Sequence, residues 1–272
     1  HSTIGGKGAD RIKVNEYMLT SDENVYALGD ATEVYNPITK KYCLIPLAGP
    51  ANKQARIVAD NIIDGNKYKY NGTIGTSIAK VFDLTVGATG SSSKVLDKEN
   101  IPHITSYTHG SSHAGYYPDS LPLSIKINFL PVDGKLLGAQ IVGFDGVDKR
   151  IDVLAEIIKQ GGTIYDLMEM EHAYAPPYSS AKDPINIAGF VADNILKEKA
   201  KIIHWNELNE LKKSDIFILD ARTKEEYELG NIEGSINIPV DEIRNRLSEI
   251  PKDKKIITYC AIGLRGYVAY RI

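Results

Sequence analysis

The chain has 272 residues, of which 43% are hydrophobic and 25% charged, and its net charge is −3 at pH 7. These values are ordinary for a soluble globular protein, and they argue against nucleic acid as the main partner. No run approaches the roughly 18 apolar residues that cross a bilayer, so we expect no membrane partner and a cytoplasmic location.

The N-terminal region is predicted to contain two short strands and one long helix. Alternating apolar residues predict a strand over residues 12–17, and residues 25–28 read as a buried strand that ends at Gly29-Asp30. From Ala51 to Gly65, helical spacing predicts a helix whose buried face consists of Ala55, Val58, Ala59, Ile62 and Ile63.

A second region starts near Gly72 with several strand candidates. The runs "PLSIKINFL" and "KLLGAQIVGF" flank an Asp133-Gly134 turn, which is typical of a β-hairpin. Helical spacing then predicts one helix over about residues 149–160 and another that begins at Asp183-Pro184. The charged residues 197–201 read as a linker.

In the last 70 or so residues, apolar strands alternate with helical segments. The strands "FILDA" and "KIITYC" are separated by a helix-forming stretch, which is typical of a parallel α/β unit.

Cys260 follows the second of these strands and enters a loop that leads into a helix. Main-chain N–H groups converge at such a position, and together with Arg265 they favour a thiolate over a thiol. An isolated cysteine is more often buried and structural. Here the spacing of Gly263 and Gly266 and the arginine favour chemistry at the thiol.

This C-terminal region resembles a rhodanese (sulfurtransferase) domain. The resemblance is carried by Asp220-Ala221-Arg222, Glu226-Tyr227, the stretch from Gly230 to Pro239, and the Cys-x4-Arg-Gly loop. It implies that Cys260 carries a persulfide and that the amides of residues 261–265 surround the outer sulfur. Asn231 stands where the family more often has His. A rhodanese domain usually continues with a further strand and helices, so we expect this one to be truncated.

Two stretches of the N-terminal region resemble the flavin-binding part of the pyridine nucleotide-disulfide oxidoreductases. A lone Gly-Asp usually marks only a turn, but Thr20-x6-Ala27-x-Gly29-Asp30 has the spacing of the second FAD motif of that family. The resemblance implies that Asp30 accepts a hydrogen bond from a ribityl hydroxyl. An ionised carboxylate suits this role, because it forms a strong hydrogen bond with a hydroxyl. The residues Leu47, Ala48 and Gly49 would place the positive end of the following helix at the flavin.

The middle region resembles the dimerisation domain of the same family. The strings "HAGYYP" and "YAPPYSSAKDPIN" are similar to those of coenzyme A disulfide reductases and NADH-dependent persulfide or polysulfide reductases fused to rhodanese. The resemblance implies that Tyr116 and Tyr174 reach across a homodimer to the sulfur chemistry at the partner's flavin, with Tyr117 and Tyr178 as near alternatives. A phenol there would donate a proton to a thiolate leaving group.

The implied fold is α/β and α+β, in three parts. Residues 1–70 are expected to be the C-terminal part of an FAD-binding domain, residues 71–197 an α+β dimerisation domain, and residues 198–272 a truncated rhodanese-like parallel α/β domain. We interpret His109 and His113 as loop histidines rather than metal ligands, because no third ligand accompanies them. Cys43 is interpreted as structural.

The family also opens with Gly-rich turns for FAD and NAD(P)H and with a redox cysteine, and "IGGKGAD" does not fit such a turn. We therefore expect a C-terminal fragment that retains FAD weakly on its own, with NADH or NADPH bound by a preceding part. The expected activity is reduction of CoA disulfide, CoA persulfide or polysulfide. Two alternatives stay open: an NADH oxidase of the same superfamily, and a non-catalytic dimerising sulfur carrier.

Overall fold

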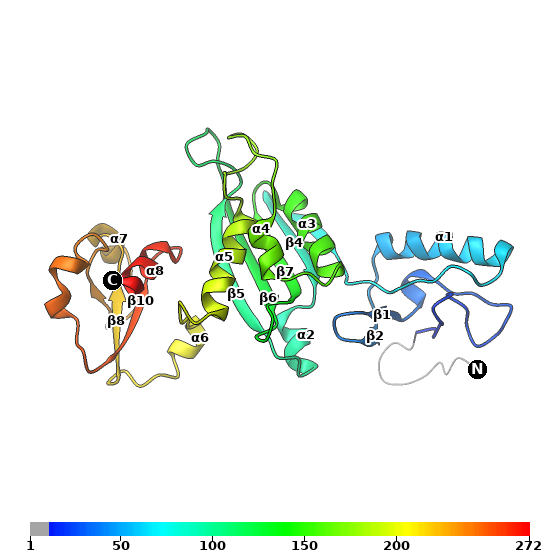
Figure 1. Cartoon of the computed structure of the whole chain (residues 1–272), viewed down its shortest axis with the longest axis horizontal. Coiled ribbons are helices and arrows are strands. Elements are labelled where there is room, and N and C mark those ends of the chain that lie inside the picture. Colours follow the sequence, from blue (N-terminus) through cyan, green and yellow to red (C-terminus); the bar gives the residue numbers. More distant parts are fainter. Residues whose placement is uncertain (1–10) are drawn as a thin grey trace.

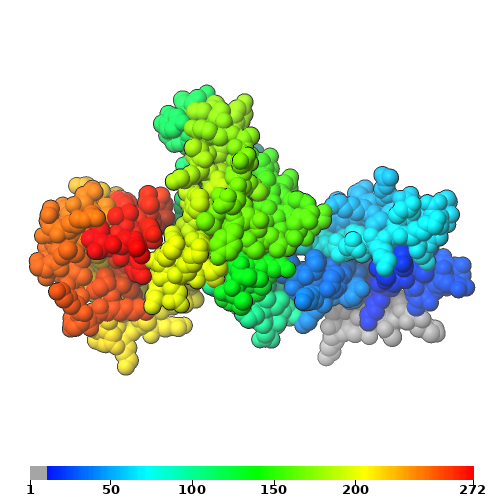
Figure 2. All heavy atoms as spheres, in the orientation of Figure 1, coloured from blue at the N-terminus to red at the C-terminus, as the bar shows by residue number. Residues whose placement is uncertain are grey.

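The computed structural model describes residues 11–272. Figure 1 shows three bodies that follow one another in chain order along the long axis of the molecule. The space-filling view in Figure 2 shows that the middle body carries a prominent projection. The stretch "IGGKGAD" lies outside the described residues.

The first body is small and contains one long helix. Its elements are the 3-10 turn η1 (Gly29–Ala31), the antiparallel strands β1 (Val34–Asn36) and β2 (Lys41–Cys43), and helix α1 (Ala48–Asp64).

The two strands expected before η1 do not form, and this prediction was wrong. Ile12 makes a single bridge to Thr32, and Tyr26 makes a single bridge to Leu19. Val25 is 48% exposed rather than buried. A strand needs a continuous ladder to a neighbour, and the described residues offer these segments only single bridges.

Helix α1 spans the expected residues but buries a different face. Ile62 and Ile63 are 60% and 83% exposed, whereas Gln54 and Asn61 are buried beside Val58. The amide of Asn61 bonds to the main chain at Tyr17, Lys67 and Tyr68, and the Gln54 side-chain oxygen accepts from the Gly29 N–H. These amides are buried because they satisfy main-chain groups of loops outside the helix.

The second body is built on a five-stranded antiparallel sheet with the order β3-β4-β7-β6-β5. The predicted hairpin is confirmed as β6 and β7, and Gly134 in its turn has φ +73°, which glycine adopts without strain. The strands are β3 (Ser77–Val81), β4 (Leu84–Gly90), β5 (Ile104–Ser111), β6 (Pro122–Phe129) and β7 (Leu136–Gly143).

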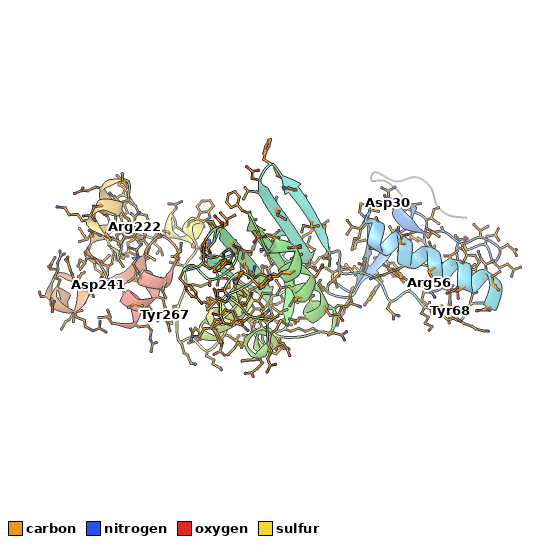
Figure 3. All side chains as sticks on the ribbon, turned by 90° about the horizontal axis from the view of Figure 1, so that it is seen from above. Asp30, Arg56, Tyr68, Arg222, Asp241 and Tyr267 are labelled. Carbon is orange, nitrogen blue, oxygen red and sulfur yellow. The ribbon has the colours of Figure 1, made fainter. Side chains whose placement is uncertain are left out.

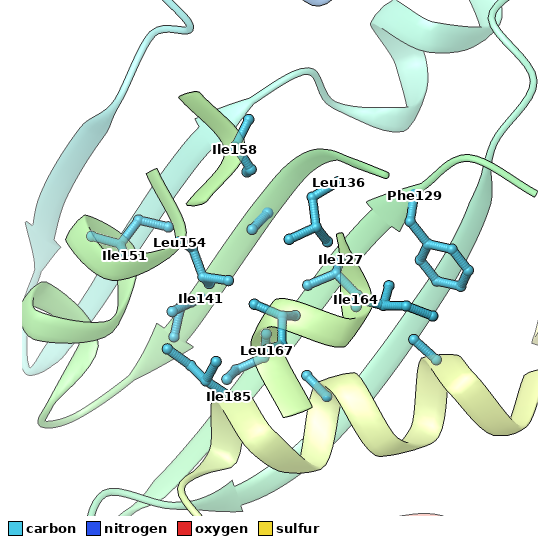
Figure 4. Packing of buried hydrophobic residues seen from close by; sticks show 14 of the residues in the cluster. Ile127, Phe129, Leu136, Ile141, Ile151, Leu154, Ile158, Ile164, Leu167 and Ile185 are labelled. Atoms are coloured by element: carbon cyan, nitrogen blue, oxygen red, sulfur yellow. The ribbon is translucent and has the colours of Figure 1, made fainter. Parts of the chain in front are cut away.

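Helices cover one face of this sheet and form the main core with it, as Figure 4 shows. The two predicted helices are confirmed as α3 and α5, and α5 begins with Asp183 as its N-cap and Pro184 in its first turn. The helices of this body are α2 (Ser93–Lys98), α3 (Val147–Lys159), α4 (Ile164–Glu169) and α5 (Pro184–Leu196).

The third body contains a three-stranded parallel sheet with the order β10-β8-β9, which confirms the predicted parallel α/β unit. Two small apolar clusters pack against it. Its elements are α6 (Trp205–Leu208), β8 (Ile216–Asp220), α7 (Lys224–Glu228), β9 (Ile236–Asn237), η2 (Ile243–Asn245), η3 (Leu247–Glu249), β10 (Lys255–Tyr259) and α8 (Leu264–Arg271).

Residues 197–204 join the second and third bodies. Arg271 of α8 donates a hydrogen bond to the Lys199 carbonyl at 2.9 Å, and the rings of Tyr107 and His204 meet edge to face with centroids 5.5 Å apart. Within residues 11–272, no helix has both the length and the apolar composition that crossing a membrane requires.

Candidate functional site

The predicted site residues fall into three separate groups, one in each body. Figure 3 labels Asp30 in the first body and Arg222 in the third, and the central sheet lies between them. The structure therefore brings residues together within each group but not between the groups.

The first group lies where η1 packs against the start of α1. A Cβ built on Gly29 would lie 3.7 Å from the Cβ of Ala51, so the Gly29-Asp30 turn contacts the first turns of the helix. Asp30 is exposed, and Leu47 is the N-cap of α1 without a side-chain hydrogen bond to the helix. The main-chain N–H groups of Ala48 and Gly49 thus stand at the positive end of α1 without a capping side chain.

This arrangement fits the flavin predicted for it. An exposed carboxylate is available to accept from a polyol hydroxyl, and uncapped N–H groups are available to an electron-rich ring edge. Gly49 would not obstruct such a ligand, because even a Cβ added there meets nothing within 4 Å. The roles of Gly29, Asp30, Leu47, Ala48 and Gly49 remain predictions.

The second group consists of Tyr116 and Tyr174, and their hydroxyl oxygens are 2.9 Å apart. Tyr116 lies in the first tyrosine loop, residues 112–121, and Tyr174 lies in the second tyrosine loop, residues 170–183. In Figure 1 the two loops rise together from one end of the central body. The side chains are 76% and 48% exposed, so both hydroxyls are accessible. The hydrogen bond that Tyr116 shares with Tyr174 raises the pKa of Tyr116 above its ordinary value.

The two alternative tyrosines are placed differently. Tyr117 packs edge to face on the ring of His113, with centroids 5.8 Å apart. Tyr178 is 69% exposed, and its carbonyl accepts from the Lys149 ammonium at 2.5 Å. The hydroxyl pair therefore distinguishes Tyr116 and Tyr174 from their neighbours, which the sequence strings alone do not.

The two histidines considered as metal ligands, His109 and His113, have structural partners. His113 is buried, with Nδ1 3.1 Å from the Ser112 hydroxyl and Nε2 2.9 Å from the Pro118 carbonyl oxygen, so it braces the first tyrosine loop. His109 lies within strand β5 and not in a loop, which corrects the expectation, and its Nδ1 is 2.8 Å from the Ser124 hydroxyl. No group of three or more His, Cys, Asp or Glu side chains suited to a metal ion occurs in residues 11–272.

The third group is the Cys260 loop at the carboxyl end of β10. The thiol accepts a hydrogen bond from the Gly263 N–H at 3.1 Å, and α8 begins with the next residue. A Cβ built on Gly266 would lie 3.2 Å from the Cα of Tyr259, so the absence of a side chain lets α8 lie close to β10 and to the loop. Of the described loop amides, Gly263 donates to the sulfur, and a wider cradle over residues 261–265 remains a prediction.

Arg265 is held by a residue to which the sequence analysis assigned no role. Its two terminal nitrogens donate to both carboxylate oxygens of Glu226, at 2.6 and 2.7 Å. This pairing lowers the pKa of Glu226 to about 2. The pairing with Glu226 is also the main cause that raises the pKa of Arg265, and the nearby charge of Cys260 makes a smaller contribution. The sequence did offer one signal for this pair, because Glu226 and Arg265 carry opposite charges and both belong to the rhodanese-like motif.

A second ion pair supports the same fold. The carboxylate of Asp220 is fully buried and accepts from the Arg222 guanidinium, which also donates to the Gly230 carbonyl at 2.7 Å. Burial alone would raise the pKa of Asp220, but the hydrogen bonds from Arg222 lower it.

The second cysteine differs from Cys260. Cys43 ends strand β2 and is half-buried, and burial raises the pKa of its thiol. This environment favours the neutral thiol, in keeping with the structural role expected for it.

Comparison with known proteins identifies both C-terminal bodies. Residues 76–184 match the pyridine nucleotide-disulphide oxidoreductase dimerisation domain, and residues 205–272 match the rhodanese-like domain. A coenzyme A disulfide reductase of Staphylococcus epidermidis is 37% identical over 181 residues, which cover 66% of this chain and 41% of that protein.

Two solved structures match almost the whole chain. The reduced CoADR-RHD of Bacillus anthracis has a TM-score of 0.93 and 49% identity, over 97% of this chain and 47% of that one. A NAD-dependent persulfide reductase from A. fulgidus has a TM-score of 0.87 and 39% identity, over 96% of this chain and 47% of that one. The chain thus spans less than half the length of these relatives.

Proposed function

Because the chain joins a pyridine nucleotide-disulphide oxidoreductase dimerisation domain to a rhodanese-like domain, we propose that it serves a flavin-dependent reductase of disulfides or persulfides. The substrates proposed are CoA disulfide, CoA persulfide or polysulfide, with NADH or NADPH as the reductant. The names of the coenzyme A disulfide reductase and the persulfide reductase support this class.

The observation that carries the proposal is the hydroxyl pair of Tyr116 and Tyr174, 2.9 Å apart on two exposed loops. Cleavage of a sulfur–sulfur bond releases a thiolate, and a nearby phenol stabilises that charge by donating a hydrogen bond or a proton. A phenol is protonated near neutral pH, as a donor requires, and the bond to Tyr174 raises the pKa of Tyr116 further.

The flavin-side residues would serve the same reaction. Asp30 would hold a hydroxyl of FAD, and the start of α1 at Leu47, Ala48 and Gly49 would face its ring, which when bound supplies the reducing electrons. In Figure 1 the tyrosine loops project from the central body and not toward α1 of the first body. This separation supports a homodimer in which the tyrosines of one chain serve the flavin of its partner.

The rhodanese-like body would handle the sulfur that the reductase consumes or produces. The Cys260 thiolate would attack the outer sulfur of a persulfide R–S–SH, which forms the Cys260 persulfide and releases the thiolate R–S⁻. The Gly263 N–H donates to the sulfur and, together with the positive charge of Arg265, would stabilise its negative charge. We also propose that the domains meet at residues 70 and 197. The proposed location of the protein is the cytoplasm.

The test is NADH consumption by the full-length protein with CoA disulfide, with CoA persulfide and with oxygen alone. We expect the sulfur substrates to be reduced faster than oxygen, and we expect Tyr174→Phe to slow their reduction by about 100-fold. The matched control is Tyr178→Phe on the same loop. Faster turnover with oxygen, unchanged in Tyr174→Phe, would favour the NADH oxidase alternative, and no turnover would favour the sulfur carrier.

A further inference from the structure

We infer that Arg150 is a positioning residue that holds the two tyrosine loops against each other. Arg150 lies on α3, outside both loops, and its side chain is 1% exposed. The inference rests on the proposed function, because it assigns Arg150 to the hydroxyl pair of Tyr116 and Tyr174.

The guanidinium of Arg150 bonds to both loops at once. One terminal nitrogen donates to the Ser112 carbonyl at 2.9 Å and to an Asp183 carboxylate oxygen at 2.7 Å. Ser112 is the first residue of the first tyrosine loop, and Asp183 is the last residue of the second. The other terminal nitrogen donates to the Gly146 carbonyl at 3.0 Å, which fixes the arginine to the start of its own helix.

In each loop, the residue that Arg150 contacts also makes a hydrogen bond within its own loop. In the second loop the Ser179 hydroxyl donates to the Asp183 carboxylate at 2.5 Å. In the first loop the Ser112 hydroxyl accepts from the Leu121 N–H at 3.2 Å, which closes the loop. Arg150 therefore joins two loops that are each already held at their base.

A plain structural ion pair would require only the contact between Arg150 and Asp183. The bond to the Ser112 carbonyl goes beyond that requirement, because it links a loop that begins 38 residues earlier in the chain. A planar guanidinium fixes the directions of its donors, whereas an ammonium is a compact charge without that fork. Lysine at position 150 would keep the positive charge but could not span the same acceptors with the same geometry.

The hydroxyl pair is sensitive to such a change. Its oxygens are 2.9 Å apart, and a displacement of about 1 Å would take them beyond hydrogen-bonding distance. Both side chains are exposed, so the positions of their hydroxyls depend on the contacts that hold the bases of the two loops. Misplacement of about 1 Å in a catalytic group can cost on the order of 100-fold in rate.

The test uses Arg150→Lys in the full-length protein, with Arg246→Lys as the control, since Arg246 is also ion-paired but lies in the third body. We expect Arg150→Lys to lower kcat for CoA disulfide by about 10- to 100-fold. NADH oxidation with ferricyanide, which takes electrons from the flavin without a sulfur–sulfur bond, should stay within about 2-fold. The control should change neither rate. Equal loss of both rates in Arg150→Lys would overturn the inference.

A double-mutant cycle separates positioning from general damage. If Arg150 acts through the tyrosines, Arg150→Lys should cost less than about 2-fold in a Tyr174→Phe background. A full, additive cost there would refute the inference while leaving the proposed function in place. If Tyr174→Phe alone has no effect on CoA disulfide reduction, the proposed role of the tyrosines is refuted, and the inference about Arg150 is refuted with it.

A milder variant covers the case in which Arg150→Lys does not fold. Ser179→Ala removes one hydroxyl that donates to Asp183 and leaves the ion pair intact. We expect a smaller loss of CoA disulfide reduction, again without loss of ferricyanide reduction. An unchanged rate of CoA disulfide reduction in this variant would count against the inference.

Discussion

The substitution Asp183→Ala should destabilise the protein more than any surface change, because it leaves a buried charge without its partner. Asp183 is 1% exposed and accepts from Arg150 Nε at 2.9 and 3.1 Å and from Nη2 at 2.7 Å. Burial alone would raise the pKa of Asp183, but these hydrogen bonds lower it, so the carboxylate is ionised in the folded state.

The expected loss in the free energy of unfolding has two causes, the broken ion pair and the lost N-cap. Removing one partner of a buried ion pair costs about 3–5 kcal/mol, and losing the N-cap of α5 adds about 1 kcal/mol. The two losses share a carboxylate and are not fully additive, so we take about 4 kcal/mol. With about 2–4 °C per kcal/mol for a domain of this size, the unfolding midpoint should fall by about 8–16 °C.

The assay is thermal unfolding followed by circular dichroism. The control is Asp60→Ala on α1, where the Asp60 side chain is 45% exposed and lies 3.8 Å from the 86% exposed side chain of Arg56. This exposed pair should contribute less than about 0.5 kcal/mol. A midpoint for Asp183→Ala within about 2 °C of the parent protein would refute the reasoning.

Two further predictions concern the third body. Cys260 should react with iodoacetamide faster than Cys43 near pH 7, because burial raises the pKa of Cys43 while the Gly263 N–H faces the Cys260 sulfur; equal rates by mass spectrometry would contradict this. The pKa of Glu226 is lowered from 4.5 to about 2, so its stabilising effect is present above pH 4.5 and is lost as the pH falls toward 2. The difference in urea midpoint between the parent and Glu226→Gln should therefore shrink on acidification, and a growing difference would exclude the pairing with Arg265.

The local elements of the fold were predictable from short stretches of sequence. The Asp133-Gly134 turn between alternating strands specifies the β6–β7 hairpin, and Asp183-Pro184 specifies the start of α5. The buried face of α1 was not predictable, because Asn61 is buried by hydrogen bonds to Tyr17, which is 44 residues away. Periodicity reports which residues are apolar, but it cannot report which main-chain groups elsewhere need a partner.

The candidate site divides along the same line. The sequence by itself determined which residues have suitable chemistry, since a thiol at a strand end and tyrosines in distinctive strings are visible without coordinates. Only the tertiary structure decided which of them meet: Tyr116 with Tyr174 across 58 residues, and Arg265 with Glu226 across 39. The physical reason is that a hydrogen bond depends on distances of about 3 Å between atoms, and packing of separate elements sets such distances.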